Sequence, residues 1–295
     1  MMPSSGLGSL TPKYIFLHIH KTAGMTLRGL CVKNFRQGRH FNTDLLYISG
    51  ANWTACRERV QNLTPPELAS YKVFKGHMYF GLHENIPVPS RYFTFLREPI
   101  QRALSHYRVI LRRKDLPEGH RIDPSLPNWN LGKEIYLMQS LDNGQTRAIA
   151  GTDPDMPFGD CNESHLAQAK KNLDTHFDFV GLTEQFDLSL LLMRKALGWG
   201  WHFYVPDNVA PQDHIPLPPQ TEQHLRTLNR YDLALYDYAR EKFQRMAEEQ
   251  GLKLKVEHGV FRLGNVIHQK LHRWKQARKA RRGAPTRPTM RADDL

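Results

Sequence analysis

Apolar positions along the chain follow two patterns, short uninterrupted runs and longer segments with apolar residues three or four apart. Runs rich in aromatic and β-branched residues are typical of buried strands, and the second spacing is typical of amphipathic helices. The runs predict a strand that begins at Tyr14 and further strands over residues 72–75, 92–96 and 177–182. The spaced segments predict helices over residues 27–35, 66–70, 99–113, 134–139, 146–150, 165–173, 186–197 and 221–250.

Polar stretches rich in proline and glycine separate these segments. They predict an irregular segment over residues 36–65, a long loop over 114–132, turns over 151–161 and a connector over 206–219. Loops as long as 114–132 are often functional. The pattern over residues 221–250 is the longest helical one, and Gly251 is a natural C-terminal stop for it.

Composition places the chain among globular proteins. Its 295 residues suit one α/β domain, or one domain with extensions, and its 40% hydrophobic residues are enough for a substantial core. The three cysteines, Cys31, Cys56 and Cys161, are too few and too scattered for a disulfide framework or a zinc site. Residues 1–13 lack the apolar segment of a signal peptide. These features predict a soluble, cytoplasmic protein.

The net charge of +12 is concentrated near the C-terminus. From residue 261 onward the chain has ten Lys and Arg against two Asp, which accounts for +8 of the total. The closely spaced basic residues from Gln269 predict a basic helix, and the Gly and Pro residues that follow predict disorder. Such a tail can bind an acidic partner.

The stretch from Tyr14 to Leu27 carries the first candidate chemistry. An apolar run passes through a turn of small residues into a segment that can start a helix, which is the geometry that aims backbone N–H groups and a helix dipole at a phosphate. It is not a Walker A loop, because Lys21 lies at the start of the turn and the required glycine spacing is missing. The candidate phosphate ligands are Lys21, Thr22, Ala23, Gly24, Met25 and Thr26.

This order, a strand followed by Lys-Thr-small-Gly-x-Thr, resembles the 5′-phosphosulfate loop of sulfotransferases. Residues 16–24 are most similar to the heparan sulfate 6-O- and 2-O-sulfotransferases and their bacterial relatives. The resemblance implies an enzyme that moves a sulfuryl group from 3′-phosphoadenosine 5′-phosphosulfate (PAPS) to a hydroxyl. It also implies an α/β, P-loop-like, three-layer fold with a central, mostly parallel sheet flanked by helices.

A second stretch, residues 96–107, follows the strand over 92–96. It resembles the 3′-phosphate-binding element of the family, with Arg97 and Ser105 at its functional positions. A guanidinium fork suits a phosphate dianion, and a hydroxyl completes its shell. Because about two helical turns separate these residues, one anion can meet both only if Arg97 folds back along the helix.

Further stretches, over residues 143–147, 169–173, 179–184 and 232–239, resemble the 6-O branch. The first of them adds Arg147 to the residues expected to bind the donor. The resemblance covers about residues 13–250. The expected organisation is a flexible N-terminus over 1–12, a sulfotransferase domain over 13–264 and a basic, partly disordered tail over 265–295.

Two histidines are candidates for the general base that takes the hydroxyl proton. His77 matches a Gly-His of the 2-O branch, and His83 matches a Gly-Leu-His of the 6-O branch. His77 is favoured, although Lys75 stands where the 2-O pattern has a histidine. Lys21 is expected to stabilise the leaving phosphate oxygen without a metal ion. His18 is expected to be a core histidine, whereas His20 can reach the donor.

The sequence does not identify the acceptor, and the resemblance suggests a carbohydrate. Loop aromatics that can stack on a sugar are Tyr79, Phe80, Trp129 and Tyr136. One rival is a P-loop-like kinase, which would need a Walker A spacing and a carboxylate for Mg²⁺. The other is a nucleic-acid or anionic-membrane binder that acts through residues 269–291, although no folded nucleic-acid motif is present.

Overall fold

The computed structural model describes residues 13–34, 39–42, 50–112, 142–206 and 219–281. Five strands form one sheet in the order β2-β3-β1-β4-β5, and every neighbouring pair is parallel. The chain therefore completes one side of β1 with β2 and β3, and then the other side with β4 and β5. The strands are β1 (Lys13–Leu17), β2 (Arg39–Asn42), β3 (Tyr71–Gly76), β4 (Ser90–Leu96) and β5 (Phe177–Leu182).

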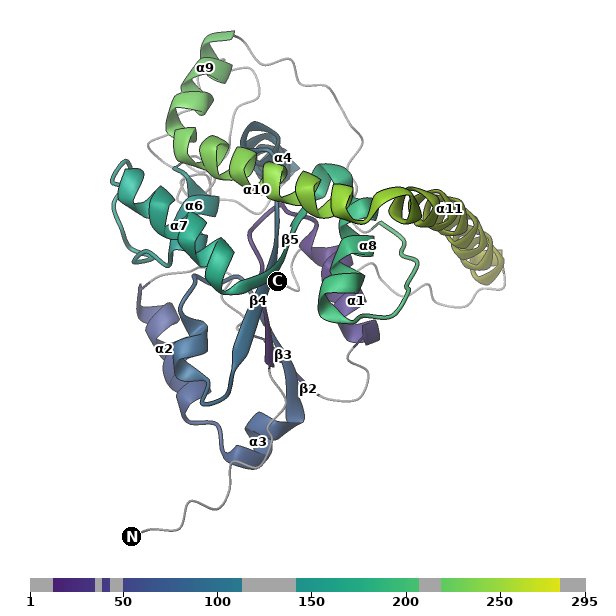
Figure 1. The fold of residues 1–295 in the computed structure, drawn as a ribbon, viewed down its shortest axis with the longest axis horizontal. Helices are drawn as coiled ribbons and strands as arrows, with labels where there is room; N and C mark the ends of the chain where they lie inside the picture. The colour runs from purple at the N-terminus through teal and green to yellow at the C-terminus, as the bar shows by residue number, and fades with distance from the viewer. Residues whose placement is uncertain (1–12, 35–38, 43–49, 113–141, 207–218, 282–295) are drawn as a thin grey trace.

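Helices cover both faces of this sheet. In Figure 1, α1 and α8 lie on one face, and α2, α6 and α7 lie on the other. The predicted three-layer α/β fold with a parallel sheet is confirmed. The helices are α1 (Gly24–Asn34), α2 (Gly50–Gln61), α3 (Pro65–Ser70), α4 (Pro99–Arg112), α6 (Gly144–Ala150), α7 (Glu163–Thr175), α8 (Phe186–Leu197), α9 (Pro219–Leu228), α10 (Arg230–Glu249) and α11 (Gly251–Arg281), with 3-10 turns η1 (Leu82–Asn85) and η3 (Thr183–Gln185).

Apolar side chains of the central strands form the core. Ile15, Phe93 and Phe95 are fully buried, and the Phe16 and Phe93 rings stack with centroids 4.9 Å apart. Strands covered on both faces need nearly continuous apolar runs, because neither set of side chains meets water. This is why β1, β4 and β5 are visible in the sequence.

Two elements were wrongly assigned to the irregular segment over residues 36–65. The four-residue strand β2 pairs with β3 at the edge of the sheet, and its polar sequence shows no strand pattern. Helix α2 buries Trp53, Cys56 and Val60, which lie three and four residues apart. That spacing is a helical signal, but its apolar positions are sparse among charged and polar residues.

The C-terminal helices also differ from the prediction. The segment over residues 221–250 is two helices, since α9 ends before Asn229, whose side-chain amide donates to the Leu225 carbonyl. Gly251 has a φ of +59°, so the chain changes direction there and a further helix begins. Helix α11 runs through residues 264 and 265 without a break. The proposed domain limits remain predictions, and α11 itself marks no boundary at 264.

Several predicted features lie outside the described residues: the N-terminus over 1–12, the loop over 114–132, the helix over 134–139, most of the connector over 206–219 and the last part of the tail. Trp129 and Tyr136 belong to this group. Among the helices that are described, none combines the length and apolar character needed to cross a bilayer.

Candidate active site

The sequence-predicted site residues follow the carboxyl ends of three adjacent strands. The loop from His18 follows β1, His77 follows β3, and Arg97 follows β4, and β1 lies between β3 and β4. Ligands of open parallel sheets bind outside the carboxyl ends of the strands, where the order of strands reverses. The order of strands reverses at β1, so the fold brings these residues to the position where a ligand is expected.

The loop between β1 and α1 has a backbone suited to an anion. Lys21 and Ala23 have φ values of 67° and 61°, in the left-handed region, and Thr22 between them does not. Alternation of left- and right-handed residues directs successive N–H groups into one concavity. Left-handed non-glycine residues cost energy and are concentrated at ligand clamps. Helix α1 begins at Gly24, directly after this loop, and the N-terminus of a helix is a favourable position for an anion.

Gly24 is required by the ring of His18. A β-carbon on Gly24 would lie 1.6 Å from His18 Nε2, so a side chain at that position would occupy the same space as the ring. The His18 ring is itself held between Phe16, at 5.4 Å, and His77, at 4.2 Å between centroids. The glycine of the motif therefore allows His18 to pack against the start of α1.

Arg97 joins the second candidate stretch, over residues 96–107, to the loop after β1. Its Nη1 donates to the Lys21 carbonyl at 3.2 Å, so the guanidinium lies against the loop after β1. The backbone of Arg97 is held by Gln145, whose Oε1 accepts from Arg97 N at 3.0 Å and whose Nε2 donates to Arg97 O at 2.8 Å. Gln145 is fully buried, whereas Arg97 and both bonds are partly buried.

Four histidines gather beside the loop: His18, His20, His77 and His106. The rings of His20 and His77 stack at 3.5 Å, and the His20 and His106 centroids are 6.3 Å apart. His106 belongs to α4, so this helix reaches the loop in its second turn. His18 was expected to be a core histidine and His20 to face the donor, and both rings are partly buried in this cluster.

Burial lowers the pKa of every member of the histidine cluster. The pKa of His77 falls to about 4, chiefly by burial, opposed by its hydrogen bond to the His18 carbonyl and assisted by the Lys21 charge. Burial and the charges of Lys21 and Arg102 lower the pKa of His106 to about 3. The pKa values of His18 and His20 are well below the usual range for the same main reason. The cluster is therefore neutral at neutral pH.

The tautomer of His77 follows from its hydrogen bond. Its Nδ1 lies 3.0 Å from the carbonyl oxygen of His18, and a carbonyl can only accept. Nδ1 therefore carries the proton, and the lone pair of the neutral ring is on Nε2. The backbone carbonyl of His18 thus sets both the tautomer and the orientation of the ring.

His83 has the opposite arrangement. The Tyr92 hydroxyl accepts from the backbone N–H groups of Gly81 and His83, at 3.3 and 3.0 Å, and lies 3.1 Å from His83 Nδ1. With its acceptor positions used, the hydroxyl donates its proton to Nδ1. The proton of the neutral His83 ring is then on Nε2. Its ring packs against Phe80 and His176, not in the histidine cluster.

The structure gives Arg147 internal partners. Its guanidinium forms a buried ion pair with Asp142 at 2.6 Å and donates to the Met156 carbonyl. Asp142 also accepts from Gly159 N at 3.1 Å. Arg147 thus holds the turns over residues 151–161 against α6. We therefore do not include Arg147, which was predicted to bind the donor, among the proposed donor ligands.

The hydroxyl residues of the two motifs differ in accessibility. Thr22 is fully buried and its hydroxyl donates to the Ile19 carbonyl at 2.8 Å, so its backbone rather than its hydroxyl proton is available to an anion. Met25 and Thr26, in the first turn of α1, are partly buried. Ser105 is partly buried on α4 beside His106. A phosphate shared by Arg97 and Ser105 remains a prediction.

Of the two described aromatics suggested for the acceptor, Tyr79 is 3% exposed, and Phe80 packs on Tyr92 and His83.

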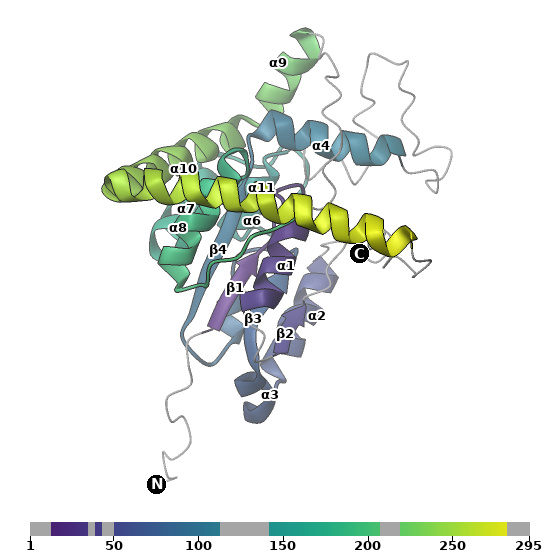
Figure 2. The same ribbon diagram turned by 90° about the vertical axis from the view of Figure 1, so that its right-hand side faces the viewer.

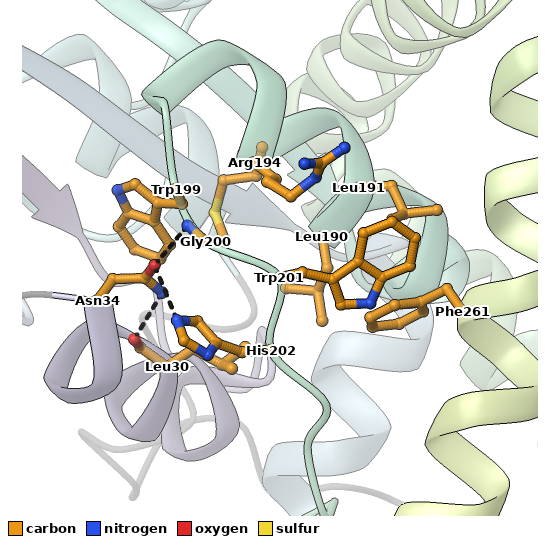
Figure 3. Close-up of a pocket in the computed structure, with 11 residues that line it drawn as sticks. Leu30, Asn34, Leu190, Leu191, Arg194, Trp199, Gly200, Trp201, His202 and Phe261 are labelled. Atoms are coloured by element: carbon orange, nitrogen blue, oxygen red, sulfur yellow. Dashed lines mark hydrogen bonds between the residues drawn. The ribbon is translucent and has the colours of Figure 1, made fainter.

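A cavity lies elsewhere, between the end of α1, α8 and α11, and Figure 3 shows Asn34, Trp199 and Trp201 in its wall. Its free volume is about 20 Å³, room for about one water molecule. Asn34 is roughly 15 Å along α1 from Gly24, so the cavity is separate from the loop.

Within the described ranges, no group of three or more His, Cys, Asp and Glu side chains is arranged to hold a metal ion.

The sequence analysis did not select two residues of the candidate site. His106 lies in the Arg97 stretch and Gln145 in the stretch over residues 143–147. The signal was the match of each whole stretch, from which only Arg97, Ser105 and Arg147 were selected.

The comparisons with known proteins agree on one kind of enzyme. A family model described as Galactose-3-O-sulfotransferase matches residues 7–274. Heparan-sulfate 6-O-sulfotransferase 2 of Danio rerio is 25% identical over 293 residues, which cover 78% of this chain and 57% of that protein. Galactose-3-O-sulfotransferase 3 of Homo sapiens is 26% identical over 262 residues, covering 81% of this chain and 59% of that protein.

The chain thus spans less than two thirds of the length of these curated relatives. Among solved structures, the crystal structure of a sulfotransferase from Alicyclobacillus acidocaldarius matches with a TM-score of 0.40 and 16% identity. That match covers 76% of this chain and 94% of the other.

Proposed function

Because the chain belongs to the galactose-3-O-sulfotransferase family, we propose that it moves a sulfuryl group from PAPS to a hydroxyl of a carbohydrate. The observation that carries the proposal is the position of His77. Its Nε2 lone pair is set by the bond to the His18 carbonyl, and its ring stacks in the cluster beside the loop after β1. A base and a phosphate cradle therefore lie side by side.

The donor would be held by two elements. The backbone N–H groups from Lys21 to Thr26 suit its 5′-phosphosulfate, because the left-handed residues and the start of α1 direct donors into one concavity. Arg97 suits its 3′-phosphate, with Ser105 as the second ligand. Arg97 contacts the Lys21 carbonyl, so the two elements meet.

In the reaction, the acceptor oxygen attacks sulfur while the bond from sulfur to the bridging phosphate oxygen breaks. The hydroxyl proton goes to His77 Nε2, and the bridging electron pair leaves with 3′-phosphoadenosine 5′-phosphate (PAP). The Lys21 ammonium stabilises the charge that develops on the leaving oxygen. The low pKa of His77 keeps it unprotonated, and the negative donor would raise that pKa towards a value better suited to a base.

The acceptor class rests on the relatives. Both comparison enzymes named above are carbohydrate O-sulfotransferases by name, one for galactose and one for heparan sulfate. We propose a sugar hydroxyl as acceptor and no metal requirement. A screen of glycans with PAPS labelled in the sulfuryl group identifies the acceptor directly.

The central test compares three variants in single-turnover transfer at saturating donor. His77→Ala should lower transfer by about 10²–10⁴-fold with little change in PAP affinity, because a base contacts the acceptor. Lys21→Ala should lower both transfer and PAP affinity, since the ammonium contacts the phosphosulfate in ground and transition states. His83→Ala is the matched control and should retain most activity.

Full activity of His77→Ala together with loss in His83→Ala would assign the base to His83. Full activity of both would remove the proposed mechanism. Phosphate transfer from ATP that requires Mg²⁺, in place of sulfuryl transfer, would identify a kinase instead.

A further inference from the structure

Helix α11 exposes a row of large apolar side chains. Seven residues spaced by four, four, three, four, four and three positions are each 50–75% exposed. They are Leu252, Val256, Val260, Leu263, Ile267, Leu271 and Trp274. This spacing keeps successive residues on one side of a helix, over roughly 33 Å of its length. We call this set the apolar row.

The apolar row lies opposite the side of α11 that packs on the protein. Leu254, Phe261 and Asn265 are the buried residues of the helix, and they contact α8 and the segment over residues 199–204. At about 100° per residue, their mean direction is roughly 150° from that of the apolar row. Figures 1 and 2 show α11 running past α1 and α8, with its C-terminal part extending beyond them.

Basic residues border the apolar row on both sides. Helix α11 contains nine Lys and Arg: Lys253, Lys255, Arg262, Lys270, Arg273, Lys275, Arg278, Lys279 and Arg281. Its one acid, Glu257, pairs instead with Lys195 at 3.2 Å and Arg194 at 3.8 Å, on the packed side. The apolar row and its borders therefore carry only positive charge.

The charge selects among possible occupants of this surface. A second copy would place two strongly basic helices against each other, so like charges would oppose the apolar contact. A nucleic acid would neutralise the basic residues, but it would leave the aliphatic row without an apolar partner. An anionic lipid surface satisfies both features, since it offers hydrocarbon below a layer of negative headgroups.

We propose that α11 is an interfacial membrane-binding helix that lies along an anionic lipid surface, with the apolar row inserted and the bordering Lys and Arg at the headgroups. Trp274 suits the same interface, because its ring is apolar with one polar N–H. The packed side of α11 stays on the protein body. The proposal does not depend on sulfuryl transfer, and binding is measurable without any acceptor.

The test uses the full chain and sedimentation with vesicles of phosphatidylcholine, with and without an equal share of phosphatidylglycerol. The protein should bind the mixed vesicles at least tenfold more tightly than the neutral ones. Raising the salt from about 0.1 to 0.5 M should weaken binding, because salt screens exposed charges. The double variant Leu263→Gln/Ile267→Gln should lose at least another tenfold at unchanged net charge.

The matched control is Val32→Gln/Phe158→Gln, which alters two exposed apolar residues outside α11 and should bind like the parent protein. Circular dichroism and PAP affinity should match across all three proteins. The proposal is overturned if the parent protein does not bind mixed vesicles, or if the α11 double variant binds as the parent does. It is also overturned if the parent is a dimer in solution that the double variant converts to monomer, or if duplex DNA binds parent and double variant equally while vesicles bind neither.

Discussion

Asn143 and Asp232 each cap the helix that begins beside the other. Asn143 Oδ1 accepts from Tyr231 N at 2.8 Å and Asp232 N at 3.2 Å, in the first turn of α10. Asp232 Oδ1 and Oδ2 accept from Thr146 N at 2.7 Å and Gln145 N at 3.1 Å, in the first turn of α6. Capping bonds of this kind satisfy helix N–H groups that have no partner within their own helix.

This pair connects distant parts of the chain to the candidate site. Asp232 is fully buried and also accepts from Arg102 of α4 at 3.2 Å. Gln145, held by Asp232, in turn holds the backbone of Arg97. The position of Arg97 therefore depends on α4, α6 and α10 together.

Gln145→Ala tests that dependence. The substitution leaves Arg97 N and O without their amide partner in a partly buried setting, which should cost about 1 kcal/mol of folding stability. PAP affinity should fall about tenfold, in the same direction as for Arg97→Ala, while AMP affinity changes less. Calorimetric titration and thermal melts measure both. Gln168→Ala, on the exposed side of α7, is the control, and an unchanged PAP affinity in Gln145→Ala would disprove the positioning role.

Gly24→Ala and Gly29→Ala separate packing from helix propensity within α1. At Gly24 the new methyl overlaps the His18 ring, so His18 must leave its stack on His77, and transfer and PAP affinity should both fall at least tenfold. At Gly29 nothing lies within 4 Å of the new methyl, and alanine should stabilise the helix by about 0.5–1 kcal/mol. Transfer assays and urea unfolding distinguish them. Wild-type activity in Gly24→Ala would show that His18 moves without consequence.

The histidine cluster should make the free energy of unfolding fall as the pH is lowered. A histidine whose pKa is lower in the folded than in the unfolded state binds fewer protons when folded, so stability falls as pH drops below about 6.5. For His77 the decline continues to about pH 4 and amounts to about 3 kcal/mol. His18, His20 and His106 act in the same direction.

Urea unfolding between pH 4 and pH 8 measures this dependence. His77→Gln should flatten the decline, since one of the four groups no longer titrates. His224→Gln, at an exposed position of α9, is the matched control and should follow the parent protein. A parent protein with constant stability across this range would contradict the neutral cluster.

Two truncations within α11, one after residue 264 and one after residue 269, should differ in folding stability. Asn265 Oδ1 accepts from Tyr204 N at 2.9 Å, and Gln269 Nε2 approaches the Tyr204 carbonyl at 3.5 Å. The sequence predicts that the domain ends at residue 264, but removal of Asn265 would leave the Tyr204 N–H without this partner and cost about 1–3 kcal/mol. Ending the chain after Gln269 should retain stability, because residues 270–281 are exposed. Equal melting temperatures for both truncations would support the boundary at 264.

Local patterns were enough to predict β1, the loop after it, and β4 with Arg97. A buried parallel strand requires a continuous apolar run, and the turn into α1 requires a small residue where His18 packs, so adjacent residues specify both features. The edge strand β2 escaped prediction, since a short edge strand is fixed by its hydrogen bonds to β3 and not by a pattern of its own.

The partners of individual side chains were determined only by the tertiary structure. His77 and His83 are both histidines after β3, and the sequence cannot show that one meets the His18 carbonyl, 59 residues away, and the other the Tyr92 hydroxyl. Those partners fix which ring nitrogen keeps its lone pair. Arg147 matched a family stretch, yet Asp142 and Met156 hold its guanidinium. A side chain's chemistry depends on the groups that reach it, and the packing of distant elements determines those groups.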